Sequence, residues 1–141
     1  MFDLHVLGRF VLSPSIENSY LCFSDNISEG EIEIYDVFNL IPKAKIRAHN
    51  SPIKAMAINY RGSLLATSSC EGSIVRVFSL PKGTRLFSFK RGISTVTMFS
   101  INFNSNSNLL VTTSDSGTLH LFQIDVANES TRKGGEETPK Y

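Results

Sequence analysis

The chain has 141 residues, with 14 lysines and arginines against 13 aspartates and glutamates, which gives a formal net charge of +1. This length allows one domain with a hydrophobic core. A chain so close to neutral has no overall field that would steer it to nucleic acid or to an anionic membrane, so any recognition of anions has to be local.

The two cysteines, Cys22 and Cys70, lack the spacing of a metal site and are too few for a disulfide framework. A reducing compartment such as the cytosol is therefore expected. The first residues are partly apolar, but Asp3, His5 and Arg9 interrupt them, which argues against a signal peptide. No apolar stretch approaches the length that spans a bilayer.

Three segments share one pattern, in which a short apolar strand, a polar turn containing glycine and a second strand ending in an aromatic residue follow one another. They are residues 20–36, 64–79 and 109–123. Their aromatic ends, Tyr35, Phe78 and Phe122, are 43 and 44 residues apart. This spacing is close to the roughly 40–45 residues of a four-stranded propeller blade.

A further strand precedes two of these segments, at residues 57–60 and 101–104. Each period thus contains about four short strands separated by Gly, Ser, Asn and Pro turns, without a convincing amphipathic helix. The sequence predicts an all-β fold of about three four-stranded blades within residues 1–127, from segments at about 12–40, 46–80 and 86–124. Residues 128–141 are polar and charged, and we expect them to form a disordered tail.

The candidate functional motif is Phe89-Lys90-Arg91-Gly92, where two cations follow a run with strand propensity. Successive side chains on a strand point to opposite faces, so Lys90 and Arg91 should serve two separate sites. Each cation suits a phosphate, Arg91 through a planar fork of donors and Lys90 as a point charge on a flexible stem. The alternative is that the pair is a solvated strand end that discourages aggregation between sheets.

The repeat resembles those of WD-repeat propellers. Ala48-His49 stands where such repeats usually have Gly-His, and Tyr35-Asp36, Phe78-Ser79 and Phe122-Gln123 stand where they usually have Trp-Asp. Once the repeat phase is fixed, FKRG and its surroundings resemble the PROPPIN family of phosphoinositide-binding β-propellers, also called WIPI proteins, in which the motif is usually FRRG or LRRG. AHNSPI, LLATSSCEGSIVRVFS, LFSFKRG and the strands of residues 101–122 follow in the family's order and spacing, and the resemblance covers about residues 12–124.

This resemblance implies a protein without enzymatic activity that binds phosphatidylinositol 3-phosphate and phosphatidylinositol 3,5-bisphosphate as a membrane-recruited adaptor in autophagy or endolysosomal traffic. It would be cytoplasmic and peripheral on phagophore, endosomal, vacuolar or lysosomal membranes. Its partners would be phosphoinositide headgroups and, for the complete propeller, autophagy proteins, with no nucleic acid, cofactor or metal. The sequence also lacks the common motifs of hydrolases and metalloproteases. The alternative function is a WD-repeat interaction scaffold that does not bind lipid.

The resemblance also implies two groups of binding residues. Lys90 would serve one pocket with Ser69, Ser73, Arg76 and His49, and Arg91 would serve the other with Ser114, Thr118 and His120. Hydroxyl groups can donate to phosphate oxygens, and an imidazole can donate or add charge. Each residue also has a purely structural alternative: an internal hydrogen-bond network for the first histidine, turn formation for the serines and threonine, and plain solvent exposure for Arg76 and His120.

Two departures from the family pattern carry expectations of their own. Lys90 replaces the usual first arginine and loses the bidentate fork, so its pocket should bind more weakly or discriminate less. The family's propeller has seven blades and this chain holds about three, so we expect a truncated form, a partial gene model or a fragment without the family's membrane-inserting loop. An open wedge should be destabilised, or else its exposed faces should pair with a second copy or another chain.

Overall fold

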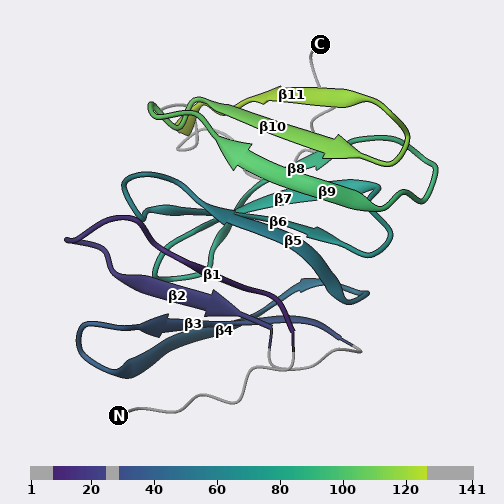
Figure 1. Ribbon diagram of the computed structural model, residues 1–141. Coiled ribbons are helices and arrows are strands. Elements are labelled where there is room, and N and C mark those ends of the chain that lie inside the picture. Colours follow the sequence, from purple (N-terminus) through teal and green to yellow (C-terminus); the bar gives the residue numbers. More distant parts are fainter. Residues whose placement is uncertain (1–7, 25–28, 127–141) are drawn as a thin grey trace.

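The computed structural model describes residues 8–24 and 29–126, and the regular elements of this part of the chain are all β-strands, which confirms the all-β prediction (Figure 1). None of these residues belongs to a helix long and apolar enough to cross a membrane. The predicted polar tail at 128–141 lies outside the described residues. The strands are β1 (Phe10–Leu12), β2 (Tyr20–Phe23), β3 (Gly30–Asp36), β4 (Ile41–His49), β5 (Ile53–Ile58), β6 (Leu64–Ser69), β7 (Ile74–Ser79), β8 (Arg85–Lys90), β9 (Met98–Phe103), β10 (Leu109–Ser114) and β11 (Leu119–Gln123).

The strands form three antiparallel sheets that stack on one another (Figure 1). The first sheet is β1-β2-β3-β4 and the second is β5-β6-β7-β8, each in chain order, while the third contains β9-β10-β11 among the described residues. This succession of hairpins is the architecture of consecutive propeller blades.

The sheets differ from the predicted segments in where each one ends. The segment expected at about 86–124 assigned β8 to the third blade, whereas β8 pairs with β7 of the second sheet, with Val77 opposite Phe87. Likewise β4 extends to His49 and belongs wholly to the first sheet, although its end was expected in the second segment. The reason is that a short turn at residues 80–84 joins β7 to β8, and strands joined by a short turn pair with each other.

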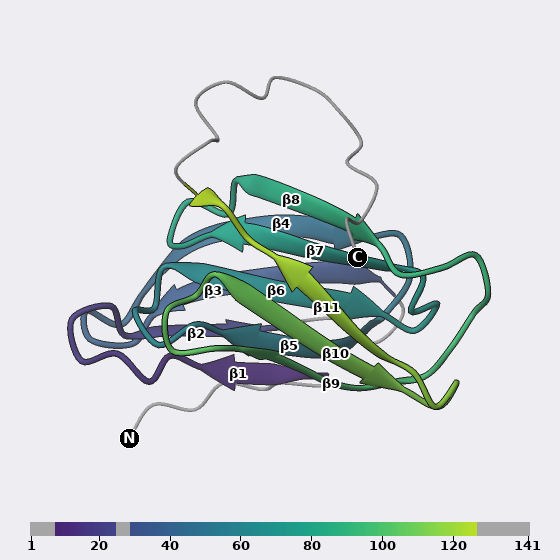
Figure 2. The same cartoon turned by 90° about the horizontal axis from the view of Figure 1, so that it is seen from above.

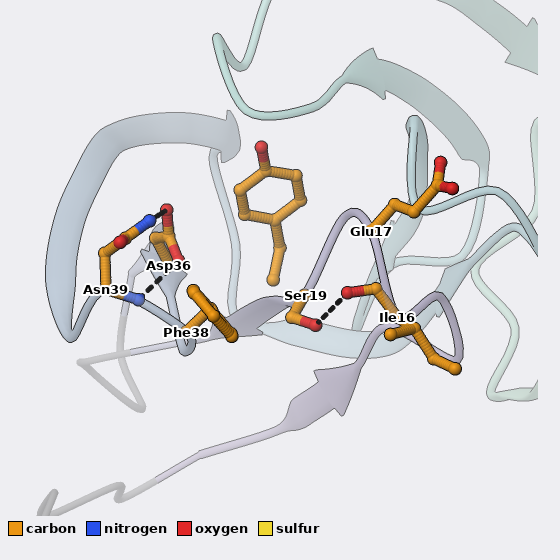
Figure 3. Close-up of a pocket in the computed structure, with 7 residues that line it drawn as sticks. Ile16, Glu17, Ser19, Asp36, Phe38 and Asn39 are labelled. Atoms are coloured by element: carbon orange, nitrogen blue, oxygen red, sulfur yellow. Dashed lines mark hydrogen bonds between the residues drawn. The ribbon is translucent and has the colours of Figure 1, made fainter.

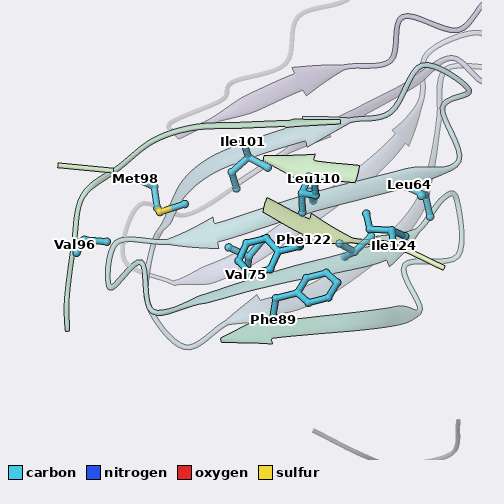
Figure 4. Close-up of a cluster of buried hydrophobic side chains, with 11 residues drawn as sticks. Leu64, Val75, Phe89, Val96, Met98, Ile101, Leu110, Phe122 and Ile124 are labelled. Atoms are coloured by element: carbon cyan, nitrogen blue, oxygen red, sulfur yellow. The ribbon is translucent and has the colours of Figure 1, made fainter. Parts of the chain in front are cut away.

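Two hydrophobic clusters hold the three sheets together. One lies between the second and third sheets, where Val75, Phe89, Leu110 and Phe122 are buried (Figure 4). The other joins the first and second sheets through residues such as Ile32, Ile34, Leu65 and Phe78. Cys22 lies in this second cluster, and burial raises the pKa of its thiol to about 12. It is therefore a core residue and not a reactive one.

Seen from above, corresponding strands of the sheets line up along two opposite edges (Figure 2). β1, β5 and β9 lie at one edge and contact one another in turn, while β4 and β8 lie at the opposite edge. The two end faces of the stack expose large apolar side chains: Phe10 is 68% exposed on the first sheet, and Leu119 is 64% exposed on the third. Both faces are thus open, as expected for an incomplete ring.

Candidate functional site

The three residues at the end of β8 have three different environments. Phe89 is buried in the core between the second and third sheets, Lys90 is exposed, and Arg91 is 8% exposed. Lys90 is paired with Ile74 across the sheet, so it shares the face of β7 that carries Arg76. This face looks toward the first sheet, because Arg76 reaches a carbonyl group of β4.

The junction between the first and second sheets contains two hydrogen bonds that cross it. Nη1 of Arg76 donates to the carbonyl oxygen of Ala48 over 2.6 Å. Nε2 of His49 lies 2.9 Å from Oγ1 of Thr67. Both bonds connect β4 with the second sheet, so they fix the relative position of the two sheets at the point where the first pocket is expected.

The ionisation of this junction follows from its burial. Burial, and then the charge of Arg76, lowers the pKa of His49 to about 4, so its imidazole is neutral at pH 7. Burial also lowers the pKa of Arg76, with a further contribution from Arg85. Nε of Arg76 is buried and has no hydrogen-bond partner. His49 thus acts as a neutral partner between sheets, as in the structural alternative, whereas Arg76 retains an unused donor.

The two serines expected in the first pocket organise the turn between β6 and β7. The hydroxyl of Ser69 accepts a hydrogen bond of 3.4 Å from the amide of Glu71, and its carbonyl accepts one from the amide of Gly72. The carbonyl of Ser73 accepts a hydrogen bond of 2.8 Å from the amide of Arg91. The structure therefore places these serines near the motif through the backbone, without joining either hydroxyl to Lys90.

Arg91 is held in a fixed orientation by two backbone carbonyl groups. Its Nε donates to the carbonyl of Gly72 over 2.7 Å, and its Nη2 donates to the carbonyl of Ser94 over 2.6 Å. A guanidinium group has five N–H donors, so these two bonds leave three for another acceptor. The side chain is thus locked in place without being saturated.

The residues expected beside Arg91 form a continuous chain of hydrogen bonds. Ser114 lies 2.8 Å from Ser116, Ser116 lies 2.7 Å from Thr118, and Oγ1 of Thr118 lies 3.2 Å from Nε2 of His120. The imidazole of His120 stacks on Phe122, which stacks in turn on Phe89. Burial, followed by the charge of Arg91, lowers the pKa of His120. Gly72, whose carbonyl group holds Arg91, packs against Val96 of the cluster between the second and third sheets, so Arg91 lies on that side of the second sheet.

The structure shows four contributors that the sequence reasoning missed. They are Thr67, Ser116 and the carbonyl groups of Gly72 and Ser94. Ser116 lies between the predicted residues Ser114 and Thr118 in the segment TTSDSGT, so its sequence position could have indicated that it joins them. Backbone carbonyls give no such signal. Gly72 has a φ of 66°, and a Cβ there would collide with the carbonyl oxygen of Val96, so this position requires glycine.

The structure also contains a pocket of about 190 Å³ away from the motif (Figure 3). It lies between the loop that follows β1 and the turn that follows β3, and Ile16, Tyr20, Asp36 and Phe38 line it. Hydrogen bonds from the side chain and then the backbone of Asn39 lower the pKa of Asp36. This carboxylate therefore stabilises the turn, and none of the predicted site residues lines the pocket.

Comparisons with known proteins identify relatives of this chain. The family model described as PROPPIN matches residues 4–139. Autophagy-related protein 18 of Yarrowia lipolytica is 40% identical over 110 residues, and WD repeat domain phosphoinositide-interacting protein 2 of Xenopus laevis is 39% identical over 123. The matches cover 78% and 86% of this chain but 28% of each relative, so the chain spans under a third of their length. The crystal structure of Kluyveromyces marxianus Hsv2 superimposes with a TM-score of 0.68 at 30% identity, over 74% of this chain and 34% of Hsv2.

Proposed function

The chain belongs to the PROPPIN family of β-propellers, and from this premise we propose that it binds the headgroups of phosphatidylinositol 3-phosphate and phosphatidylinositol 3,5-bisphosphate. Lys90 and Arg91 are the central cations of two separate sites. The relatives are named autophagy-related and phosphoinositide-interacting proteins, and these names support the general role.

One observation carries the proposal: the two neighbouring cations lie at two different junctions between sheets. Lys90 shares a face with Arg76 beside the first sheet. Arg91 is held by Gly72, which packs against Val96 in the cluster between the second and third sheets. The guanidinium group of Arg91 is 8% exposed and is held by two carbonyl groups. The alternative interpretation, a solvated strand end that discourages aggregation, does not account for this arrangement.

The two sites should differ in how well they are prepared for a phosphate. The fork of Arg91 is fixed before any ligand arrives, so little rotamer entropy is lost on binding. The chain from Ser114 to His120 offers further donors beside it. The ammonium of Lys90 is exposed, and forms no hydrogen bond or ion pair with the described residues. Binding at Lys90 must therefore order a flexible side chain, and that site should be the weaker one.

Each site alone should hold a membrane only briefly, and both together should hold it for longer. Once one headgroup is bound, the second site meets other headgroups at a high effective concentration. We therefore propose a peripheral adaptor on membranes that carry these lipids, such as phagophore, endosomal, vacuolar or lysosomal membranes. Autophagy proteins would be its protein partners. This adaptor does not require catalysis, so the proposed role is not enzymatic.

The experiment is sedimentation with vesicles that contain phosphatidylinositol 3-phosphate, beside vesicles with phosphatidylinositol alone and vesicles with the 3,5-bisphosphate. The variant is Lys90→Ala/Arg91→Ala, and the matched control is Lys54→Ala/Arg61→Ala, which removes two cations from β5 and the loop after it. Circular dichroism checks that all chains fold. Selective binding that only the first variant abolishes supports the proposal. A folded chain that ignores the phosphorylated lipids, or that keeps binding after the double substitution, would favour a protein-interaction scaffold.

A further inference from the structure

The pocket on the first sheet has a chemistry that the proposed lipid sites do not use. Its volume of about 190 Å³ is below the roughly 300–1,000 Å³ of sites for drug-sized ligands, so it suits one large side chain. One wall is the turn between β3 and β4, and the other is the loop between β1 and β2. Figure 3 shows the first wall through Asp36, Phe38 and Asn39, and the second through Ile16 and Glu17. A pocket of this size can receive an anchor residue of a partner protein.

Hydrogen bonds fix both walls of the pocket. The amide of Val37 donates to the carbonyl of Ser19 over 3.0 Å, which ties the turn to the loop. Nδ2 of Asn18 donates to the carbonyl of Arg61 over 2.8 Å, which ties the loop to the second sheet. The pocket is therefore formed before a partner arrives, and binding would spend little free energy on ordering its walls.

The rim of the pocket holds large apolar side chains in water. Ile16 is 92% exposed on one wall, and Phe38 is 82% exposed on the other. Leu40, in the same turn as Phe38, is also exposed and has a φ of 56°, a left-handed conformation that is unfavourable for a leucine. Neighbouring exposed apolar residues on a fixed frame are typical of a surface that binds another protein.

Inside this rim, the polar groups present mainly lone pairs. The hydroxyl of Ser19 donates to the carbonyl groups of Ser15 and Ile16, at 3.1 and 3.2 Å, so its oxygen remains as an acceptor. Nδ2 of Asn39 donates to the carboxylate of Asp36 over 2.8 Å, which leaves the amide oxygen of Asn39 as a further acceptor. The lining therefore favours an occupant that donates hydrogen bonds.

The charges of the pocket point to the same kind of occupant. Asp36 is ionised at pH 7, because a side-chain and then a backbone hydrogen bond from Asn39 lower its pKa, and Nζ of Lys43 lies 3.6 Å from it. Glu17 is exposed on the opposite wall and forms no ion pair with residues 8–24 or 29–126. Two carboxylates thus line the pocket, and only one of them has a cation as partner. Arginine and lysine are the side chains that carry a positive charge and only donors.

We propose that this pocket binds an arginine side chain of a partner protein, and that an apolar residue beside this arginine covers Phe38 and Ile16. The guanidinium group would donate to the acceptors of the lining, while its aliphatic stem would lie along the apolar rim. Arginine fits better than lysine, because its planar group has five donors and stacks on aromatic rings, and Tyr20 and Phe38 both line the pocket. The contact is independent of the proposed lipid sites, because none of their residues lines the pocket.

The test uses the full chain and the capped tripeptide acetyl-Leu-Arg-Leu-amide, followed by the NMR shifts of the Ser19, Val37 and Phe38 amides. The matched probe replaces arginine with citrulline, which keeps the shape and removes the charge. We expect saturable shifts with the arginine peptide and an affinity about tenfold lower with the citrulline peptide, because charge-assisted hydrogen bonds are stronger than neutral ones. Phe38→Ala and Glu17→Gln should each weaken binding of the arginine peptide. Glu33→Gln, which removes the same charge from the opposite face of β3, should not.

Three outcomes would overturn the proposal. Equal binding of the arginine and citrulline peptides would mean that the pocket recognises only apolar residues. Absent binding, or binding that Phe38→Ala and Glu17→Gln leave unchanged, would exclude the pocket as the site. Self-association of the chain in analytical ultracentrifugation that Phe38→Ala removes would assign the rim to a second copy of this chain instead.

The same variants separate this proposal from the proposed function. Lys90→Ala/Arg91→Ala should keep the affinity for the arginine peptide, and Phe38→Ala should keep the affinity for phosphatidylinositol 3-phosphate vesicles. The side chains of Phe38 and Glu17 are exposed, so thermal melts of their variants should match the wild type. A loss of peptide binding in the Lys90/Arg91 variant would place the peptide at the lipid sites and refute the pocket as its binding site.

Discussion

Replacing Arg91 with lysine keeps the positive charge but removes the geometry that holds it. The guanidinium donates to the carbonyls of Gly72 and Ser94 at 2.7 and 2.6 Å, and the residue is 8% exposed. Hydrogen bonds to charged groups contribute about 1.5–3 kcal/mol each, and an ammonium at this position can retain one of the two at best. Arg91→Lys should therefore lower the free energy of unfolding by about 1.5–3 kcal/mol.

Arg91→Lys should also weaken lipid binding directly, in addition to lowering the free energy of unfolding. A flexible ammonium cannot present a fixed fork to a phosphate, so we expect affinity for phosphatidylinositol 3-phosphate vesicles to fall about tenfold, which is about 1.4 kcal/mol. Urea denaturation and vesicle sedimentation measure the two effects separately. Lys90→Arg is the matched control, because Lys90 is exposed and makes no comparable bonds, and it should leave stability unchanged and binding equal or tighter.

The opposite outcome is an Arg91→Lys chain that unfolds at the wild-type urea concentration and binds the vesicles as tightly as the wild type. That result would mean that the two carbonyl contacts do not position the charge. An equal loss of affinity for Lys90→Arg would show instead that any change in the motif disturbs binding.

Three further predictions concern stability. Phe89→Ala should cost about 3–5 kcal/mol in a urea titration, because the ring is buried and stacks on Phe122 at 4.9 Å between ring centroids; a cost below about 1 kcal/mol would contradict the packing. The pKa of His49 is lowered to about 4 in the folded chain, so the unfolded chain takes up a proton first and stability should fall by up to about 3 kcal/mol as the pH drops from 6.5 to 4. His49→Gln should flatten that part of the pH profile. Gly72→Ala should destabilise the chain because of its positive φ and crowded Cβ position, whereas Gly92→Ala, with open space around it, should be nearly neutral in thermal melts.

The parts of the fold that could be predicted from the sequence are those that depend on local periodicity. The alternation in IVRVF correctly indicated that Val75 and Val77 point into the core and that Arg76 does not. The grouping of strands into sheets was harder to predict, because the repeat in the sequence does not reveal whether the last strand of each sheet pairs with the strand before it or the strand after it. β8 lies between two repeats in the sequence, and only the short turn at residues 80–84 decides that it pairs with β7.

The candidate site divides in the same way. The alternation of Lys90 and Arg91 predicted two faces, and the structure places these side chains at different junctions. The position of His49 beside Thr67 depends on the contact between two sheets, which no local pattern contains. The carbonyls that hold Arg91 were beyond sequence reasoning, because every residue has a carbonyl and only the folded turn selects those of Gly72 and Ser94. The binding roles of the site residues remain predictions.

The location of the two proposed sites explains how many sheets they would require. Each one lies at a junction, the first fixed by bonds from β4 to the second sheet and the second fixed by aromatic stacking between β8 and β11. Two junctions need three consecutive sheets. The second sheet contributes to both, because each of its two faces lines one junction. Phe89 is then the point of coupling, since its ring anchors the third sheet while the next two residues supply the cations. A loosened Phe89 should disturb the Arg91 site before the Lys90 site, because the first cluster of the core lies on the Arg91 side only.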